Sequence, residues 1–163
     1  MKSDFLVIGS GSAGLSFALK AAKVGKVTIV TKGELAECNT NYAQGGICSV
    51  TYQPDTFEKH IEDTLVCGAG KCAQEAVELV VRNAPEAIEN LIEWGTRFDK
   101  NEAGEFDLHR EGGHSEHRIL HHADLTGAEI ERALIESVKA HPNITVLEHH
   151  FAIDLLTQHH LGE

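Results

Sequence analysis

The sequence predicts an α/β fold with a parallel sheet, and its N-terminal segments provide three observations in support. An apolar run at residues 4–8 leads directly into a glycine-rich turn at residues 9–14, GSGSAG. An alanine-rich segment at 15–22 follows, and a second apolar run, VTIV, occupies 27–30. A strand, a glycine turn, a helix and a second strand in this order form a βαβ unit with parallel strands. We therefore expect residues 1–32 to begin an open α/β sheet.

The glycine turn between the first strand and the helix indicates a dinucleotide site. Gly9 permits the tight turn, Gly11 allows the backbone to approach a pyrophosphate, and Gly14 lets the helix pack closely on the strand. The N–H groups and the positive end of the helix dipole then face the phosphates. A glycine-rich turn in an ordinary α/β protein is the alternative, and the flanking strand and helix favour the dinucleotide interpretation.

The end of the second strand does not identify the dinucleotide. An acid that binds the ribose is expected about 20 residues after the glycines, but Thr31, Lys32 and Gly33 occupy that place and Glu34 is the nearest acid. This weakens the usual NAD pattern. A lysine suits a phosphate or another anionic group, and the residues alone leave the choice open.

Composition limits the classes of partner. The 163 residues carry a formal net charge of −11, with 42% hydrophobic and 24% charged residues. These values are typical of one globular domain, and the negative charge argues against nucleic acid and anionic membranes. The N-terminal apolar run is too short for a signal peptide or a membrane span, so a cytoplasmic protein is expected. The four cysteines lack a CxxC pair and are expected to be reduced thiols.

The middle of the chain is expected to be an insertion, residues 33–125, between the second and third strands of the sheet. It begins with a polar loop rich in glycine. Apolar spacing then predicts helices at 55–67, with Asp55 or Thr56 as the cap, at 73–83, and from Pro85 to Gly95. We expect these three helices to form a packed lid. A hairpin is expected around residues 97–109.

The last part of the chain, residues 126–163, is expected to return to the sheet. Thr126 and Glu129 have the spacing of a capping box, which predicts a helix through about residue 140. Apolar runs at 144–148 and 152–156 predict two further strands.

The charged loop at 110–118, REGGHSEHR, is the best candidate for substrate contact. Glu111 is either an acid–base or ion-pairing group of a site or one half of a surface ion pair. His117 and His121 would share a face of a helix, as zinc ligands can. Because no third ligand with convincing spacing accompanies them, we predict no metal site and favour anion binding or positioning for these histidines.

Three motifs in this order resemble the L-aspartate oxidase family of the succinate dehydrogenase and fumarate reductase flavoprotein superfamily. They are GSGSAG at 9–14, NTNYAQGG at 39–46, and REGGHS at 110–115 followed by RILH at 118–121. The resemblance covers essentially the whole chain. It implies a Rossmann-like FAD-binding domain with a long helical insertion after the second strand.

The family binds FAD, and the resemblance assigns the contacts. Phe151 and Ala152 match a contact near the adenine half, although a polar residue would be expected in place of Phe151. The predicted cofactor-binding residues, with those of the glycine motif, are Gly9, Ser10, Gly11, Ser12, Ala13, Gly14, Lys32, Asn39, Thr40, Asn41, Tyr42, Ala43, Gln44, Gly45, Gly46, Phe151 and Ala152.

Two positions separate the subfamilies. Succinate dehydrogenases attach flavin covalently to a histidine at the place that Asn39 holds here, so FAD is expected to be non-covalent. The dicarboxylate enzymes resemble the 110–115 loop but lack the acid at Glu111. A carboxylate can hold an α-ammonium group, so Glu111 is predicted to be the catalytic-site residue that selects aspartate over succinate.

The resemblance implies the oxidation of L-aspartate to iminoaspartate in NAD biosynthesis. Oxygen or fumarate would reoxidise the flavin, and the product would pass to quinolinate synthase. The family's chains are several times longer, so these residues are expected to be the N-terminal part of a truncated FAD-binding domain, inactive by itself and weak in FAD affinity. The alternatives are a soluble fumarate reductase or succinate dehydrogenase flavoprotein, and a non-catalytic nucleotide-binding module.

Overall fold

A three-stranded parallel sheet lies at one end of the molecule. In the computed structural model, which describes residues 2–162, strand β1 (Phe5–Ile8) is followed by helix α1 (Ser12–Ala21) and strand β2 (Val27–Val30). Strand β5 (Ile144–Leu147) pairs with the other edge of β2, with Val27 opposite Ile144, and gives the order β1-β2-β5. The predicted α/β fold with a parallel sheet is confirmed.

The core lies between this sheet and two helices. Helix α4 (Thr126–Ala140) crosses α1, and the two helices pack against one another. Leu15 and Leu134 are fully buried in this contact region, and Ile29 of β2 is fully buried beneath them. Burying a side chain of this size contributes about 1.5–3 kcal/mol, so these residues fix the position of the glycine turn at the start of α1.

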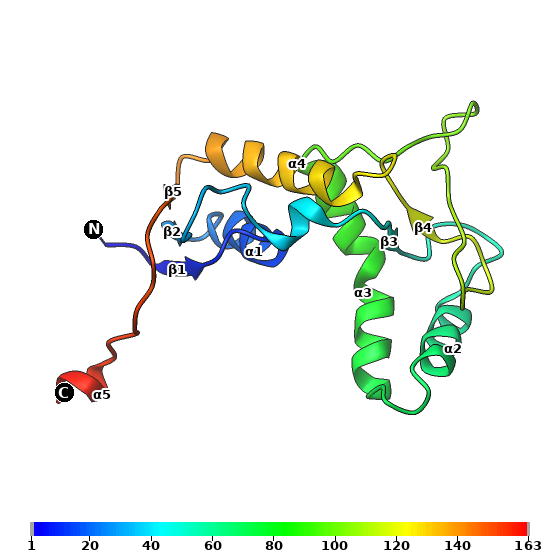
Figure 1. Cartoon of the computed structure of the whole chain (residues 1–163), viewed down its shortest axis with the longest axis horizontal. Coiled ribbons are helices and arrows are strands. Elements are labelled where there is room, and N and C mark those ends of the chain that lie inside the picture. The colour runs from blue at the N-terminus through cyan, green and yellow to red at the C-terminus, as the bar shows by residue number, and fades with distance from the viewer. Residues whose placement is uncertain (1, 163) are drawn as a thin grey trace.

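Helices α2 (Phe57–Cys67) and α3 (Gln74–Glu93) form an arm that extends away from the sheet (Figure 1). Thr56 caps α2 by accepting a hydrogen bond from the Lys59 N–H, as predicted. The prediction of separate helices before and after Pro85 is wrong, because α3 runs continuously through Pro85.

The apolar spacing of α3 explains its continuity. Val81, Ile88 and Leu91 are all buried along one side of the helix. Val77 and Ala84 continue the same helical face, which crosses the proline without interruption. A proline inside a helix costs about 3 kcal/mol, and burial of this face offsets that cost. The insertion therefore contains two long helices where three were expected.

Two short strands connect the insertion to the cofactor end. Strand β3 (Ile47–Cys48) pairs antiparallel with β4 (Ile119–Leu120), with Ile47 opposite Leu120. The 3-10 helix η1 (Asn39–Tyr42) precedes β3 and packs against α4. Pairing of Lys100 with Phe106 confirms the predicted hairpin turn. The β3–β4 pair thus places the segment after η1 beside the loop 110–118.

The capping box predicted at the start of α4 does not form. The cap position is Leu125, and Thr126 Oγ1 accepts instead from the His122 N–H at 3.1 Å. Glu129 accepts a hydrogen bond from the Arg97 N–H at 2.9 Å and pairs with Arg132. Thr126 therefore bonds to a backbone group four residues earlier and Glu129 to one 32 residues earlier, so neither side chain forms the cap.

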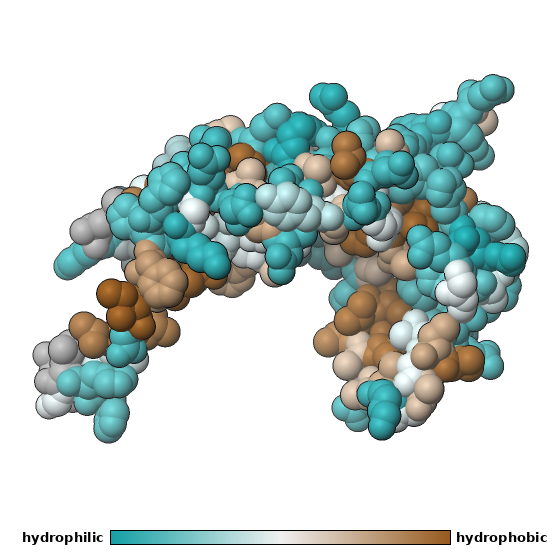
Figure 2. Space-filling model, in the orientation of Figure 1, coloured by the Kyte–Doolittle hydropathy of each residue, from teal (hydrophilic) through white to brown (hydrophobic). Residues whose placement is uncertain are grey.

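The strand predicted at 152–156 is also wrong. This segment is extended but unpaired with any strand of residues 2–162, and it leads to the short helix α5 (Gln158–Leu161). Its apolar side chains are exposed, with Ile153 at 91% exposure, and they form the brown tail in Figure 2. An apolar run becomes a strand only where a free sheet edge receives it.

Across residues 2–162 none of the helices has the length and apolar character needed to cross a membrane.

Candidate cofactor and substrate site

The glycine turn has the backbone geometry that its sequence predicted. Gly9 adopts φ = +106°, a conformation that residues with a side chain rarely adopt, and its N–H bonds to the Val30 carbonyl. A Cβ on Gly14 would lie 2.5 Å from the Gly9 carbonyl oxygen, which confirms the close helix–strand approach. Helix α1 has neither a capping side chain nor an acid in its first turn, so its N-terminal dipole is not neutralised by its own residues 12–15.

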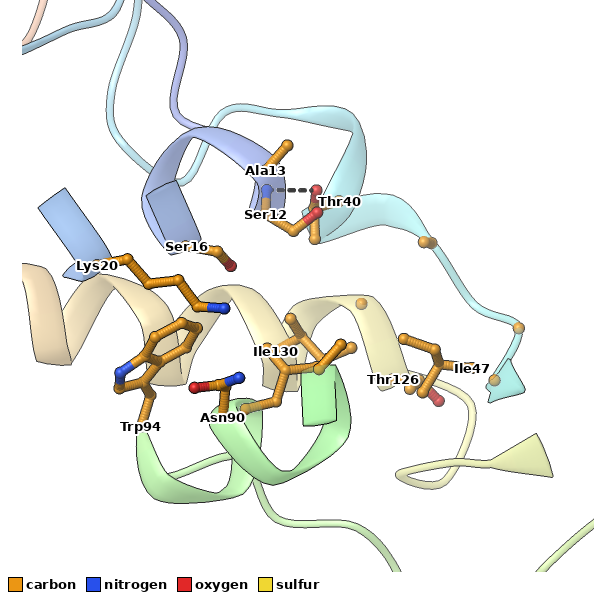
Figure 3. A pocket seen from close by; sticks show the side chains of 16 residues that line it. Ser12, Ala13, Ser16, Lys20, Thr40, Ile47, Asn90, Trp94, Thr126 and Ile130 are labelled. Carbon is orange, nitrogen blue, oxygen red and sulfur yellow. Dashed lines mark hydrogen bonds between the residues drawn. The ribbon is translucent and has the colours of Figure 1, made fainter. Parts of the chain in front are cut away.

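The second predicted cofactor segment lies against this turn. Thr40 Oγ1 accepts a hydrogen bond from the Ser12 N–H at 3.1 Å, and a Cβ on Gly11 would meet the same oxygen at 3.4 Å (Figure 3). Ser12 and Thr40, which are 28 positions apart in the sequence, therefore lie together at the N-terminus of α1. Thr40 takes one of the N–H groups that a phosphate would otherwise use.

Close backbone contacts hold this second segment on its other side. Gly127 of α4 lies so near to it that a Cβ would meet the Thr40 carbonyl oxygen at 2.0 Å and that of Ala43 at 2.6 Å. The Gly127 N–H donates to the Ala43 carbonyl at 2.9 Å. At the other end, a Cβ on Gly46 would lie 2.5 Å from the Leu120 carbonyl oxygen. Glycine at 46 and 127 is thus required by packing.

A cavity of about 450 Å³ opens between α1, the 40–47 segment, α3 and α4 (Figure 3). Trp94 and Asn90 of α3 form one wall, and Lys20 of α1 lies beside Trp94 with its ammonium group as a positive charge. Pockets of this size, apolar with a few polar groups, are typical of ligand sites. The predicted cofactor residues that line the cavity are Ser12, Ala13, Thr40, Ala43, Gly45 and Gly46.

Asn39, Asn41 and Tyr42 belong to η1, where the Tyr42 hydroxyl donates to Glu37 at 2.8 Å, and Gln44 follows this helix. Three other predicted contacts, Lys32, Phe151 and Ala152, lie near the carboxyl end of the sheet. Lys32 is exposed directly after β2, and the His150 N–H returns to the carbonyl of Thr31 at 3.0 Å. Phe151 and Ala152 follow and lie beside Leu6 and Ile8 on the face of β1. Ligands of open α/β sheets bind at this end. The side chain of Ser10 is buried and its Oγ lies 3.2 Å from Thr31 Oγ1, so only its backbone faces the site.

Loop 110–118 begins and ends at a single antiparallel pair, His109 with Ile119. Glu111 is exposed on this loop. Burial raises the pKa of the Cys48 thiol in β3, Arg118 acts in the opposite direction, and the negative charge of Glu111 adds to the rise. Glu111 therefore lies within electrostatic range of the strand that directly follows the cofactor segment.

A buried ion-pair network anchors this loop to α2. The Arg118 guanidinium is fully buried and binds both oxygens of Asp55, at 2.7 and 2.8 Å. It also bonds to Asp63, which accepts hydrogen bonds from the backbone and hydroxyl of Ser115 at 2.8 Å. Burial alone would lower the pKa of Arg118, but the bonds to Asp55 and Asp63 raise it overall. Sequence reasoning missed Asp55 and Asp63, because a network spanning 63 residues leaves no local pattern.

A second buried acid lies beneath η1. Glu131 of α4 is fully buried, and burial raises its pKa to about 7. Its neighbour is the Cys38 thiol, which directly precedes η1 and whose pKa is also raised by burial. A carboxyl group in this environment is favoured in its neutral form. The sequence shows Glu131 only as one charge on a helix.

The expectation that His117 and His121 share a helix face is wrong. The chain is a strand at 119–120, and the residues before it form a loop. His117 is exposed, whereas His121 is buried and lies near Asp99 and Asp107.

The glycine turn, the cavity and the β3–β4 pair define a dinucleotide-binding domain, and the comparisons identify its class. The model of the FAD binding domain family matches residues 4–161, so this chain belongs to the FAD-binding domain family and its cofactor is FAD. The cradle fits this group, because a Cβ on Gly9 would meet nothing within 4 Å and the first turn of α1 contains no acid that would repel a phosphate.

The relatives by sequence are L-aspartate oxidases. The chloroplastic enzyme 2-a of Nicotiana tabacum is 56% identical over 154 residues, covering 94% of this chain and 24% of its own length. The enzyme of Vibrio cholerae is 48% identical over 164 residues, covering 98% of this chain and 31% of its own length. The chain therefore spans 24–31% of the length of these relatives.

Solved structures show the same domain. The quinol fumarate reductase of E. coli is similar with a TM-score of 0.87 and 29% identity, over 94% of this chain and 27% of that chain. The Sdh1 complex of Mycobacterium smegmatis has a TM-score of 0.82 and 28% identity, over 90% of this chain and 27% of that one.

Proposed function

We propose that this chain is the cofactor-binding part of an enzyme that oxidises L-aspartate to iminoaspartate. The observation that carries the proposal is the β3–β4 pair, which places the loop containing Glu111 beside the end of the cofactor segment. The names of the relatives, at 48–56% identity, agree with this substrate. When bound, FAD supplies a two-electron acceptor for the hydride of the substrate.

The residues of the chain have separate roles in this proposal. The backbone at Gly9–Gly14, the 39–46 segment and Lys32 hold FAD, without a covalent bond because Asn39 offers no nucleophile. Phe151 and Ala152 contact its adenine half. The Glu111 carboxylate holds the α-ammonium group of aspartate, and the Arg118 network orients the loop that carries it. Parts of the enzyme outside this sequence would bind the substrate carboxylates.

The partners and location follow from the same assignment. The electron acceptor is oxygen or fumarate, and the product passes to quinolinate synthase. A cytoplasmic location belongs to this proposal, whereas the plant relatives are named chloroplastic.

A titration with FAD, and in parallel with NAD, tests the cofactor assignment. Quenching of flavin fluorescence and a higher melting temperature are expected with FAD alone. A response to NAD and none to FAD would overturn the assignment.

The role of Glu111 is tested by Glu111→Gln in the full-length enzyme. The change removes the charge that pairs with the ammonium group, so kcat/KM for aspartate should fall by about 10–100-fold, the equivalent of about 1.4–2.7 kcal/mol. Reduction of fumarate, which has no ammonium group, should change little. Glu102→Gln, on an exposed turn, is the control. Equal losses in both reactions would contradict the role in specificity.

Measurement of both reactions also distinguishes a second candidate function, that of a fumarate reductase. The similarity to the E. coli enzyme favours this candidate. A full-length protein that reduces fumarate and does not oxidise aspartate would establish that candidate.

A further inference from the structure

The loop 110–118 is closed at its base by a cluster of three side chains that the proposed reaction does not use. Asp107 and His109 precede the loop and His121 follows it. One ligand atom from each of these residues lies within 4.8 Å of the other two. We call this group the Asp107 cluster.

Strand geometry brings the three side chains together. Asp107 and His109 are two residues apart on an extended segment, so they point to the same side. The antiparallel pair of His109 with Ile119 places the next residues of the other arm, including His121, opposite them. The rings of His109 and His121 stack with centroids 3.8 Å apart. Asp107 Oδ2 lies 3.9 Å from His109 Nε2 and 3.7 Å from His121 Nε2.

His121 is oriented by a second carboxylate behind it. Its Nδ1 lies 3.2 Å from Asp99 Oδ2, so the tautomer with the ring proton on Nδ1 directs that proton at a carboxylate. The Nε2 atom then carries a lone pair that points toward the Asp107 carboxylate. The side chain of His121 is about nine-tenths buried, and among residues 2–162 Nε2 has no hydrogen-bond partner. A lone pair facing an anion is unfavourable unless a cation lies between them.

We infer that the Asp107 cluster binds a divalent transition-metal ion such as Zn²⁺, through His109 Nε2, His121 Nε2 and Asp107 Oδ2. Imidazole and carboxylate are ligands that Zn²⁺ accepts, and an outer carboxylate on the other ring nitrogen is the usual support of a metal-bound histidine. Bonds of about 2.0–2.2 Å in a tetrahedral site separate ligand atoms by roughly 3.4 Å. The two distances from Asp107 Oδ2, 3.7 and 3.9 Å, need a contraction of a few tenths of an ångström, and the stacked rings of His109 and His121 must turn so that both nitrogens face the ion.

The ion would join the two ends of the loop 110–118. This inference does not depend on the proposed substrate, because it concerns the base of the loop and not Glu111. It revises the expectation of no metal site, which rested on the lack of a third ligand near His117 and His121. Two of the three ligands come from the Asp107–His109 arm, and His117 is not among them.

A second cluster, Cys48, His60 and His114, has the same span of ligand atoms but is less suited to a dication. Burial lowers the pKa of His60, and the charge of Arg118 lowers it further. The same guanidinium would repel a metal ion there, whereas the Asp107 cluster has the carboxylates of Asp99 and Asp107 beside it.

The test is titration of the full-length, FAD-loaded protein with ZnCl₂ by isothermal calorimetry, after EDTA treatment and dialysis. We expect saturable binding of one ion per chain, with Kd in the micromolar range or tighter. His109→Gln and His121→Gln should each weaken binding by more than the roughly 10–100-fold that loss of an outer-shell partner costs. His109 is 59% exposed, so its variant is expected to fold even if the His121 variant does not.

His117→Gln is the matched control, since His117 is an exposed histidine of the same loop and lies outside the cluster. It should leave Kd unchanged. Absence of saturable binding would overturn the inference. Equal affinity in wild type and His109→Gln, or an equal loss in His117→Gln, would overturn it as well.

Discussion

The cofactor end and the loop 110–118 are held in place by different forces. At the cofactor end, backbone lies against backbone, with glycine at 14, 46 and 127 where a Cβ would come within 2.6 Å of a carbonyl oxygen. The loop is instead tied to α2 by a buried guanidinium and two carboxylates. The first region depends on the absence of side-chain volume, and the second on the pairing of charge. The two regions should therefore respond to different substitutions.

The largest effect is expected at Arg118. Arg118→Met leaves the fully buried Asp55 carboxylate without its partner, and breaking such a pair costs about 3–5 kcal/mol. The free energy of unfolding, measured in urea, should fall by that amount. Arg82→Met is the matched control, because the Arg82–Glu58 pair is exposed to solvent and contributes little to stability. Similar losses in the two variants would show that buried charge does not hold the loop.

The contribution of Glu131 to stability should depend on pH, unlike the packing of the glycines. Its folded-state pKa, raised to about 7 by burial, lies above the ordinary value of 4.5. The stability that the neutral carboxyl provides is complete below about pH 4.5 and is lost as pH rises through 7. Glu131→Gln should therefore unfold like wild type at pH 5 and be more stable at pH 8, by about 1–3 kcal/mol.

Urea unfolding at both pH values measures this difference. Glu62→Gln, at an exposed position, should show no such pH dependence. If the difference in free energy of unfolding between wild type and Glu131→Gln were the same at pH 5 and pH 8, this result would contradict a neutral buried carboxyl group.

Neighbouring glycines test the steric claim at the cofactor end. A Cβ on Gly46 would lie 2.1 Å from Ile119 Cγ2, whereas one on Gly45 would meet nothing within 4 Å. Gly46→Ala should lower stability by about 1–3 kcal/mol and weaken FAD binding. Gly45→Ala should cause neither loss, because its Cβ would not clash with any neighbour. Equal thermal melts for the two variants would refute the packing argument.

The smallest effect is expected at the cap of α2. Thr56→Ala removes the bond from the Lys59 N–H and should cost about 1 kcal/mol. Thr56→Ser keeps the hydroxyl and should retain most of that stability in the same urea experiment. If the alanine and serine variants were equally stable, the cap would contribute nothing.

Helix and strand prediction succeeded where the signal was local. The glycine turn, the cap at Thr56 and the helix from Thr126 all follow from residues within a few positions of each other. It failed where a distant partner decided the outcome. Glu129 bonds to Arg97, 32 residues away, in place of the cap, and the apolar run at 152–156 has no strand to pair with in residues 2–162.

The sequence by itself determined the parallel sheet, the cofactor turn and the loop that contains Glu111, because spacing, glycine conformation and charge act over short distances along the chain. Only the tertiary structure decided which buried charges meet. Arg118 with Asp55, His121 with Asp99 and Asp107, and Glu131 with Cys38 all depend on segments that folding brings together. The cost of burying an unpaired charge is what selects those partners.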